Sequence, residues 1–261
     1  MENRKILIGN DDGILAPGIE LLEQVASEFP SDITVIAPET NRSAMSHSVT
    51  LLSPLRVNEI KHKHYAVAGT PVDCMLFGLR YLFDENNLPD LVLSGINNDL
   101  NIAEDVIYSG TVAVVREAAL FGIPSIAFSQ QRCPDKSIRW DVATRYAPIV
   151  LNKIINSYTF KRGEYLCVNF PAVGVNDVKG IKVVPHGIRT IKDRMIKGID
   201  PRNCPYYWLD VGMYYYDRAS NEYTDNCAID DGYITIVPLT VNMTNNSSLS
   251  TLRDMCDEEY K

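Results

Sequence analysis

Two adjacent acidic residues close the first apolar segment of the chain, and they constrain the fold more than any other feature. Lys5–Gly9 reads as a short strand that stops at Asn10-Asp11-Asp12-Gly13, and an amphipathic helical pattern begins after Pro17. A strand, an acidic turn and a helix open an α/β sheet, in which ligands bind outside the carboxyl ends of the strands. Two neighbouring carboxylates repel each other unless a positive charge lies between them. The turn therefore indicates either a hard divalent cation or an Asx-turn with a capping Asp.

The order of the later segments predicts an α/β fold with a doubly wound, mostly parallel, Rossmann-like sheet. Thr70 and Pro71 are a favourable N-cap and first residue for one of its helices. A hairpin formed by 49–57 and 64–68 is expected to flank the sheet. Further strands are expected at 33–37, 91–93, 123–128 and 165–169, and further helices from 110 and over 139–158.

The sequence changes character beyond Pro171, where Gly, Pro and Tyr become frequent. Four segments there read as antiparallel strands, at 182–185, 206–211, 214–217 and 233–238, and 245–261 reads as a short exposed helix. We expect one domain over residues 1–261, in which about 172–240 include an extended β-hairpin arm. A Tyr-rich hairpin has too little core to be stable alone, so it either folds back on its own sheet or contacts a second subunit.

Composition and charge argue against several classes of partner. The 261 residues carry a net charge of −8 and no clear basic patch, so binding of a nucleic-acid polymer is not expected. The first strand begins within five residues of Met1 and no apolar run approaches a membrane span, which predicts a cytoplasmic protein without a membrane partner. Six widely spaced cysteines without a C-x-x-C pair predict reduced thiols, most of them in the core.

Three further polar segments follow later strands, and the topology brings them near the first. They are Asn41–His47, Ser94–Asn97 and Ser109-Gly110-Thr111, the last at a helix start. Two carboxylates, a hydroxyl and an amide oxygen form an all-oxygen ligand set for Mg²⁺ or Mn²⁺. Ser109-Gly110-Thr111 offers N–H groups and hydroxyls to an anion. Together with a candidate acid or base, these features indicate phosphoester hydrolysis.

Each segment taken alone also fits a structural role. Ser109 suits an N-cap, and Asn41 and Asn97 suit turns. Arg42 either adds positive charge to the site or is a solvated surface cation. His47 is either a proton donor or acceptor near neutral pH or a surface histidine.

Several motifs in order along nearly the whole chain resemble the SurE family of nucleotidases. The opening motif is followed by Ala16-Pro17-Gly18, and the resemblance continues through Gly69-Thr70-Pro71, Ser94-Gly95-Ile96-Asn97 and Asp105–Val112. It extends to Asp200-Pro201-Arg202, Tyr207-Trp208, Thr224-Asp225 and Asp231-Gly232-Tyr233.

This resemblance implies a divalent-metal-dependent phosphatase that acts on nucleoside 5′- or 3′-monophosphates, with exopolyphosphatase activity in some members. It implies one Mg²⁺ or Mn²⁺ per subunit, held by Asp11, Asp12, Ser43 and Asn97. Phosphate would contact Ser109, Gly110 and Thr111, with Asn41 or Ser46 as further candidates, and Asp11, Asp12 and His47 are the catalytic candidates. The family also forms homodimers by exchange of a C-terminal arm, and often tetramers.

Two departures from the family pattern lie beside Asn97. Asp99 and Ala103 stand where glycines are usual, so the loop is expected to be stiffer or reshaped, and Asp99 adds a carboxylate. Thr240 stands where many members have a histidine, so no role of that histidine carries over.

Two other classes compete with the nucleotidase. One is a haloacid-dehalogenase-like phosphatase with a covalent Asp nucleophile, although its Asp-x-Asp motif is not matched by Asp11-Asp12-Gly13. The other is a non-catalytic nucleotide- or metal-binding protein, for which Asp99 is the main indication.

Overall fold

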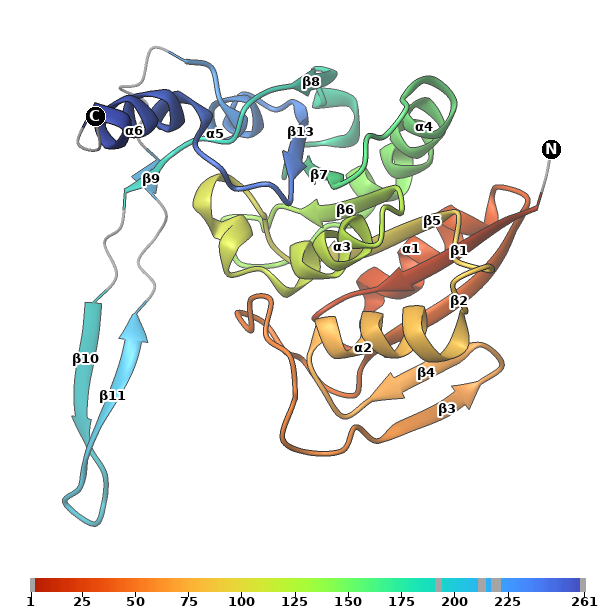
Figure 1. Cartoon of the computed structure of the whole chain (residues 1–261). Helices are drawn as coiled ribbons and strands as arrows, with labels where there is room; N and C mark the ends of the chain where they lie inside the picture. Colours follow the sequence, from red (N-terminus) through yellow and green to blue (C-terminus); the bar gives the residue numbers. More distant parts are fainter. Residues whose placement is uncertain (1–2, 191–193, 211–214, 217–221, 259–261) are drawn as a thin grey trace.

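A nine-stranded sheet forms the centre of the computed structural model, which describes residues 3–190, 194–210, 215–216 and 222–258 (Figure 1). The strand order is β3-β4-β2-β1-β5-β6-β7-β13-β8, and the six strands from β4 to β7 in this order run parallel. The predicted α/β class is confirmed. The strands of this sheet are β1 (Arg4–Gly9), β2 (Ser31–Pro38), β3 (Val57–Lys61), β4 (His64–Val67), β5 (Leu91–Asn97), β6 (Ser125–Gln130), β7 (Glu164–Phe170), β8 (Ile181–Val183) and β13 (Ile234–Thr240).

Helices cover both faces of the sheet, because successive side chains of each buried strand point to opposite sides. Ile6 and Ile8 of β1 pack in a cluster with α1 (Pro17–Ser27) and α4 (Asp141–Ser157), whereas Leu7 packs with α2 (Pro71–Phe77) and α3 (Gly110–Leu120). Within the described part of the chain, no helix has the length and hydrophobicity needed to cross a lipid bilayer. The helices are α1 (Pro17–Ser27), α2 (Pro71–Phe77), η1 (Gly78–Leu82), η2 (Ala103–Ile107), α3 (Gly110–Leu120), α4 (Asp141–Ser157), η3 (Val175–Asp177), α5 (Asp225–Asp230) and α6 (Asn246–Glu258).

The flanking hairpin begins later than the sequence indicated. It is formed by β3 and β4, and residues 49–56 are not a strand. The reason is that Thr50 is bound to α2 instead of to a strand: its N–H donates to Asp73 Oδ1 (2.9 Å) and its hydroxyl to Asp73 Oδ2 (2.6 Å). The same Asp73 forms a capping box with Thr70, which confirms the predicted helix start.

Two other expectations need correction. The segment at 182–185 was expected to be antiparallel, but β8 pairs parallel with β13, and it is β13 that runs antiparallel to β7. The six cysteines are free, as predicted, but only Cys74 and Cys167 are buried. Cys133 and Cys204 lie in loops, and Cys227 and Cys256 lie on helices near the C-terminus, where residue type alone does not specify burial.

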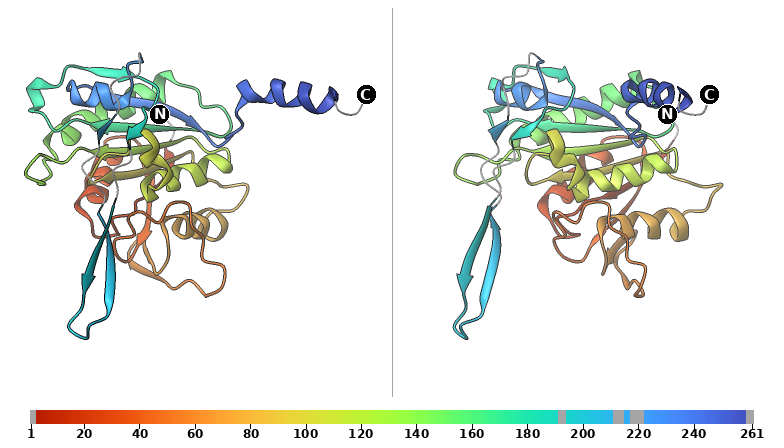
Figure 2. Two further views of the ribbon diagram at one scale, coloured as in Figure 1. Left: turned by 90° about the vertical axis from the view of Figure 1, so that its left-hand side faces the viewer. Right: turned by 60° about the vertical axis from the view of Figure 1, so that its left-hand side comes forward.

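An antiparallel hairpin of β10 (Arg194–Ile199) and β11 (Pro205–Asp210) projects from the body, as does α6 (Figure 2). Its Tyr206, Tyr207 and Trp208 are exposed. A second short ladder joins β9 (Arg189–Thr190) to β12 (Tyr215–Tyr216), also antiparallel. Parts of three expected elements lie outside the described residues. They are residues 214 and 217 of the strand expected at 214–217, residue 211 of the strand expected at 206–211, and residues 259–261 of the helix expected at 245–261.

Gly18 allows α1 to contact the strand that ends at the site, and we predict that Gly18→Ala is strongly destabilising. A Cβ at this position would lie 1.9 Å from the backbone oxygen of Ile96, which cannot move aside without shifting β5. We expect a loss of about 2–3 kcal/mol in the free energy of unfolding, the upper part of the range for overpacking. Urea denaturation measures it, with Glu20→Ala on the exposed side of α1 as the control. Equal stability of Gly18→Ala and the control would contradict this packing.

Candidate active site at the carboxyl ends of the strands

A cleft of about 390 Å³ lies where the strand order reverses, between the neighbours β1 and β5. Ligands of doubly wound folds bind at this switch point. Four of the predicted site residues line it, namely Asp11, Ser43, Asn97 and Ser109, and so does Asp99. The other predicted site residues are not among those that line it: Asp12, Asn41, Ser46, His47, Gly110 and Thr111. A larger opening of about 900 Å³ lies at the amino end of β1, and none of the residues singled out from the sequence lines it.

The acidic turn is held by its own flanking residues. The side chain of Asn10 donates to the Gly13 oxygen (2.9 Å) and accepts from the Gly13 N–H (3.1 Å). Gly13 has a φ of +108°, a conformation that a side chain would strain. Asn10 and Gly13 therefore stabilise the turn, and the side chains of Asp11 and Asp12 remain available for contacts with neighbouring loops and helices.

Asp11 is almost fully buried, with 4% of its surface exposed. The Thr111 hydroxyl donates to its Oδ1 (2.5 Å), and its backbone oxygen accepts the N–H of Arg42 (2.7 Å). Burial raises the pKa of Asp11, and the hydrogen bonds from Thr111 and Gly110 oppose that rise. The contact with Gly110 requires a glycine, since a Cβ there would lie 2.6 Å from Asp11 Cβ.

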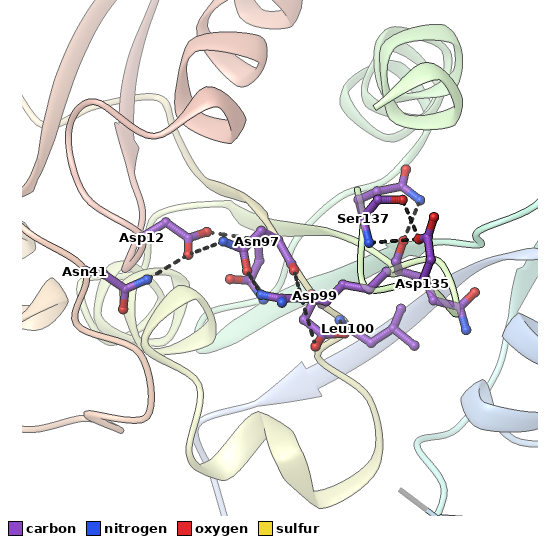
Figure 3. A network of polar contacts seen from close by, with 11 residues as sticks. Asp12, Asn41, Asn97, Asp99, Leu100, Asp135 and Ser137 are labelled. Carbon is purple, nitrogen blue, oxygen red and sulfur yellow. Dashed lines mark hydrogen bonds and ion pairs between the residues drawn. The ribbon is translucent and has the colours of Figure 1, made fainter. Parts of the chain in front are cut away.

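Asp12 is less buried and is bound on two sides (Figure 3). Its Oδ1 accepts the side-chain amides of Asn41 (3.2 Å) and Asn98 (2.9 Å), and its Oδ2 accepts the Asn98 N–H (3.2 Å). Burial, and then repulsion from Asp11, raise the pKa of Asp12 to about 6, against opposing effects of Asn98 and Arg132. A cation between the two carboxylates would relieve this repulsion.

Ser43 and Asn97 bring neutral oxygens to the same cleft. The Ser43 N–H donates to the Asn41 side chain (2.8 Å), which fixes the loop after β2 beside Asp12. The amide nitrogen of Asn97 donates to the Asp99 backbone oxygen (2.7 Å), so the orientation of the amide is set and its oxygen is left as an acceptor.

Ser109-Gly110-Thr111 begins α3, and both of its hydroxyls already have partners. Ser109 is the N-cap and accepts the Val112 N–H (3.0 Å), while the buried Thr111 binds Asp11. The structural role of Ser109 that the sequence left open is therefore present. The N–H groups in the first turn of a helix lack intrahelical partners and suit an anion.

The loop after β2 is braced by two other candidates. The Ser46 hydroxyl donates to the Ile107 oxygen (2.7 Å), and the Ser46 N–H donates to the Tyr108 oxygen (3.0 Å). His47 Nε2 pairs with Glu117 of α3 at 2.8 Å, and His47 is not among the residues that line the cleft. Its role in proton transfer stays a prediction.

Asn98 and Arg132 line the cleft and were not assigned from the sequence, and Asp225, which binds the loop after β5, was not assigned either. Arg132 follows β6 and donates to the Asn98 backbone oxygen (2.7 Å) and to Asn98 Oδ1 (2.6 Å). Asp225 at the start of α5 accepts the N–H of Ala103 (3.0 Å) and of Gly187 (2.7 Å). The rule that ligand-binding residues follow parallel strands applies to Arg132, but nothing in the sequence pairs Asp225 with Ala103.

The acidic turn and the cleft beside it fit a hard cation, although among the described residues no group of three His, Cys, Asp or Glu side chains is suited to a metal. The set consists of two carboxylates, one hydroxyl and one amide oxygen, and the adjacent carboxylates are both destabilised as anions. Oxygen donors of this kind suit Mg²⁺ or Mn²⁺, which retain several waters, better than zinc.

The fold and the cleft define a doubly wound α/β protein whose switch point carries a cleft with two neighbouring carboxylates. The chain belongs to the SurE family, because the family model described as Survival protein SurE matches residues 6–193. It is 40% identical over 245 residues to a protein of Rhodopseudomonas palustris named 5′-nucleotidase SurE, covering 93% of this chain and 95% of that one. A protein of the same name from Paramagnetospirillum magneticum is 40% identical over 248 residues, covering 95% of this chain and 94% of that one. The crystal structure of the SurE protein from Aquifex aeolicus superposes with a TM-score of 0.80 at 35% identity, covering 96% of this chain and 99% of that one.

Proposed function

We propose that this chain is a divalent-metal-dependent 5′-nucleotidase that hydrolyses nucleoside monophosphates to nucleoside and phosphate. The observation that carries the proposal is the pair of adjacent carboxylates that follows β1 at the switch point of the sheet: Asp11 lines the cleft and bonds to Thr111 of α3, and Asp12 is the next residue of the same turn. The name 5′-nucleotidase of the relatives supports the same reaction. The two competing classes, a covalent-Asp phosphatase and a binding protein without turnover, receive no such support.

Asp11, Asp12, Ser43 and Asn97 would hold one Mg²⁺ or Mn²⁺ per subunit. Their oxygens come from three loops that hydrogen bonds join: Arg42 to Asp11, Asn41 to Asp12, and Asn98 to Asp12. When bound, such a cation polarises the phosphoryl oxygens and stabilises the charge that develops during displacement.

The phosphate of the substrate would lie beside the first turn of α3, where the helix dipole favours an anion and where the phosphate would compete with the Asp11 carboxylate for the N–H groups of Gly110 and Thr111. Ser109 caps this turn and Thr111 joins it to Asp11, so the anion site and the cation site are fixed relative to each other. Asn41 and Ser46 remain candidates for further phosphate contacts. This arrangement stabilises charge on the phosphoryl group in the transition state.

We expect direct attack of water on phosphorus, with the P–O ester bond breaking and the nucleoside leaving oxygen taking up a proton. The carboxylate oxygens of Asp11 and Asp12 already accept hydrogen bonds and are proposed as cation ligands. Neither carboxylate is therefore suited to attack phosphorus and form an acyl phosphate. A single displacement inverts the configuration at phosphorus. Hydrolysis of a chiral phosphate ester measures this, and net retention would favour the covalent mechanism.

A panel of substrates tests the proposed function. Full-length protein is assayed with nucleoside 5′-monophosphates, 3′-monophosphates and short polyphosphates, after EDTA treatment and after addition of Mg²⁺ or Mn²⁺. We expect turnover of 5′-monophosphates that EDTA removes and the cation restores. Activity on 3′-monophosphates and on polyphosphate ends is a further part of the proposal, tested in the same panel. No turnover of any nucleotide with either cation would reject the enzyme in favour of a binding protein.

We also propose that the chain forms a homodimer by exchange of the arm, and the same measurement tests further pairing into a tetramer. Trp208 and Tyr207 are 68% and 59% exposed on a hairpin that contributes no core of its own. Large aromatic side chains are enriched at interfaces. Light scattering at micromolar concentration should give at least twice the 29.3 kDa chain mass, and Trp208→Ala should shift it toward the monomer. A monomeric mass for the unaltered protein would refute the exchanged arm.

A further inference from the structure

We propose that Arg132 is a positioning residue for Asp12, acting through Asn98 and held in place by Asp99. The inference rests on the metal site of the proposed function and extends it to residues that do not touch the cation. Arg132 follows β6, whereas Asn98 and Asp99 follow β5, so the proposal links the ends of two neighbouring strands.

The first step is the contact between Asn98 and Asp12. Asn98 donates to both carboxylate oxygens, from its side-chain amide to Oδ1 (2.9 Å) and from its backbone to Oδ2 (3.2 Å). Two donors on two oxygens fix the rotation of the carboxylate. A carboxylate whose rotation is fixed presents its remaining lone pairs in one direction, which is what a cation ligand requires.

The second step is the orientation of the Asn98 amide. Its nitrogen can donate to Asp12 only if its oxygen points the other way, and that oxygen accepts a guanidinium N–H of Arg132 (2.6 Å). A second guanidinium N–H binds the Asn98 backbone oxygen (2.7 Å). Guanidinium has donors and no acceptor, so it excludes the flipped amide, in which two donors would face each other.

The third step is the role of Asp99, the carboxylate that stands where the family pattern has a glycine. Asp99 Oδ2 lies 3.4 Å from Arg132 Nε. Asp99 is labelled in Figure 3, where it lies beside Asn97. The extra negative charge is therefore balanced by a cation that follows the adjacent strand. Asp99 and Arg132 together provide this chain with a support for Asp12 that a glycine at position 99 could not supply.

Calorimetric titration of the full-length protein with Mn²⁺ tests the proposal. It is carried out on the unaltered protein and on four variants: Arg132→Gln, Arg132→Lys, Asn98→Ala and the double variant Arg132→Gln/Asn98→Ala. Partners that orient a ligand typically contribute roughly 10- to 100-fold to metal affinity, and we expect a loss near the lower end for Asn98→Ala and for Arg132→Gln. Arg132→Lys should lose affinity as well, because an ammonium cannot reproduce the two-point fork. The double variant should be no weaker than Asn98→Ala. Arg139→Gln is the matched control, since Arg139 belongs to the same connection but pairs with Asp141.

Steady-state kinetics on a 5′-monophosphate provide a second readout. Loss of positioning lowers kcat at saturating substrate and Mn²⁺, and leaves KM nearly unchanged. Unchanged Mn²⁺ affinity with a raised KM in Arg132→Gln would show that Arg132 binds substrate directly, and would overturn the proposal. Full affinity in Arg132→Lys, or additive losses in the double variant, would overturn it too. If the unaltered protein binds no Mn²⁺, the metal site of the proposed function fails and the positioning role fails with it.

Discussion

We expect replacement of Asp12 by Asn to remove most of the turnover and to weaken Mn²⁺ binding. The change deletes one of the two carboxylates of the proposed ligand set. It also replaces one acceptor oxygen by an NH₂ donor, so at least one of the three hydrogen bonds that Asn41 and Asn98 donate to this side chain is lost. Lewis-acid stabilisation of the transition state is worth several kcal/mol, and each 1.4 kcal/mol is a factor of ten, so we expect kcat/KM to fall by about a hundredfold or more.

Kinetics at saturating Mn²⁺ and calorimetric titration measure the two effects of Asp12→Asn. Asp32→Asn is the matched control, because Asp32 lies at the opposite end of the parallel strands, where it pairs with Lys63 on the surface. The thermal unfolding midpoint should change little in either variant. Unchanged Mn²⁺ affinity in Asp12→Asn would remove Asp12 from the ligand set.

The second large effect is expected from Gly110→Ala, which separates the anion site from the cation site. The added Cβ would lie 2.6 Å from Asp11 Cβ and 2.9 Å from Pro71 Cγ, so α3 has to move away from the acidic turn. A shift of about 1 Å of a substrate-positioning group costs about a hundredfold in rate. The overpacking itself should cost about 1–3 kcal/mol of stability.

Activity and urea denaturation separate these two consequences of Gly110→Ala. Leu120→Ala at the other, exposed end of α3 is the control for a general change in the helix. We expect the control to keep full activity. A Gly110→Ala protein that is folded and as active as the unaltered chain would contradict the close contact of α3 with Asp11 and its part in catalysis.

The sequence predicted the fold well where the signals are local. The short apolar run of β1, the Thr70 cap and the glycine after Asp12 each act over a few residues, and the structure has the expected strand, helix start and turn there. The hairpin was placed too early because Thr50 binds Asp73, a contact between residues 23 positions apart that no periodicity encodes. The pairing of β8 likewise depends on β13, which lies some fifty residues further along the chain.

The same distinction applies to the site. Strand ends predicted that Asp11, Ser43, Asn97 and Ser109 would come together, and they line one cleft. The side-chain partners were not predictable, because Asn98 and Arg132 meet through the shapes of two loops. Ala103 provides another example: it adopts a φ of +48° where the family usually has a glycine, and the buried Asp225 binds its N–H. The loop that carries this departure from the family pattern is therefore held by a residue 122 positions further along the chain.

The central claim is that one divalent cation lies between Asp11 and Asp12, within reach of Ser43, Asn97 and the first turn of α3. Anomalous diffraction at the manganese edge from crystals of the full-length protein with Mn²⁺ and inorganic phosphate locates the ion directly. The account predicts one manganese peak per subunit among these four side chains, with phosphate between the peak and Ser109-Gly110-Thr111. A manganese peak elsewhere, or an empty cleft in an enzyme that hydrolyses nucleotides under the same conditions, would contradict it.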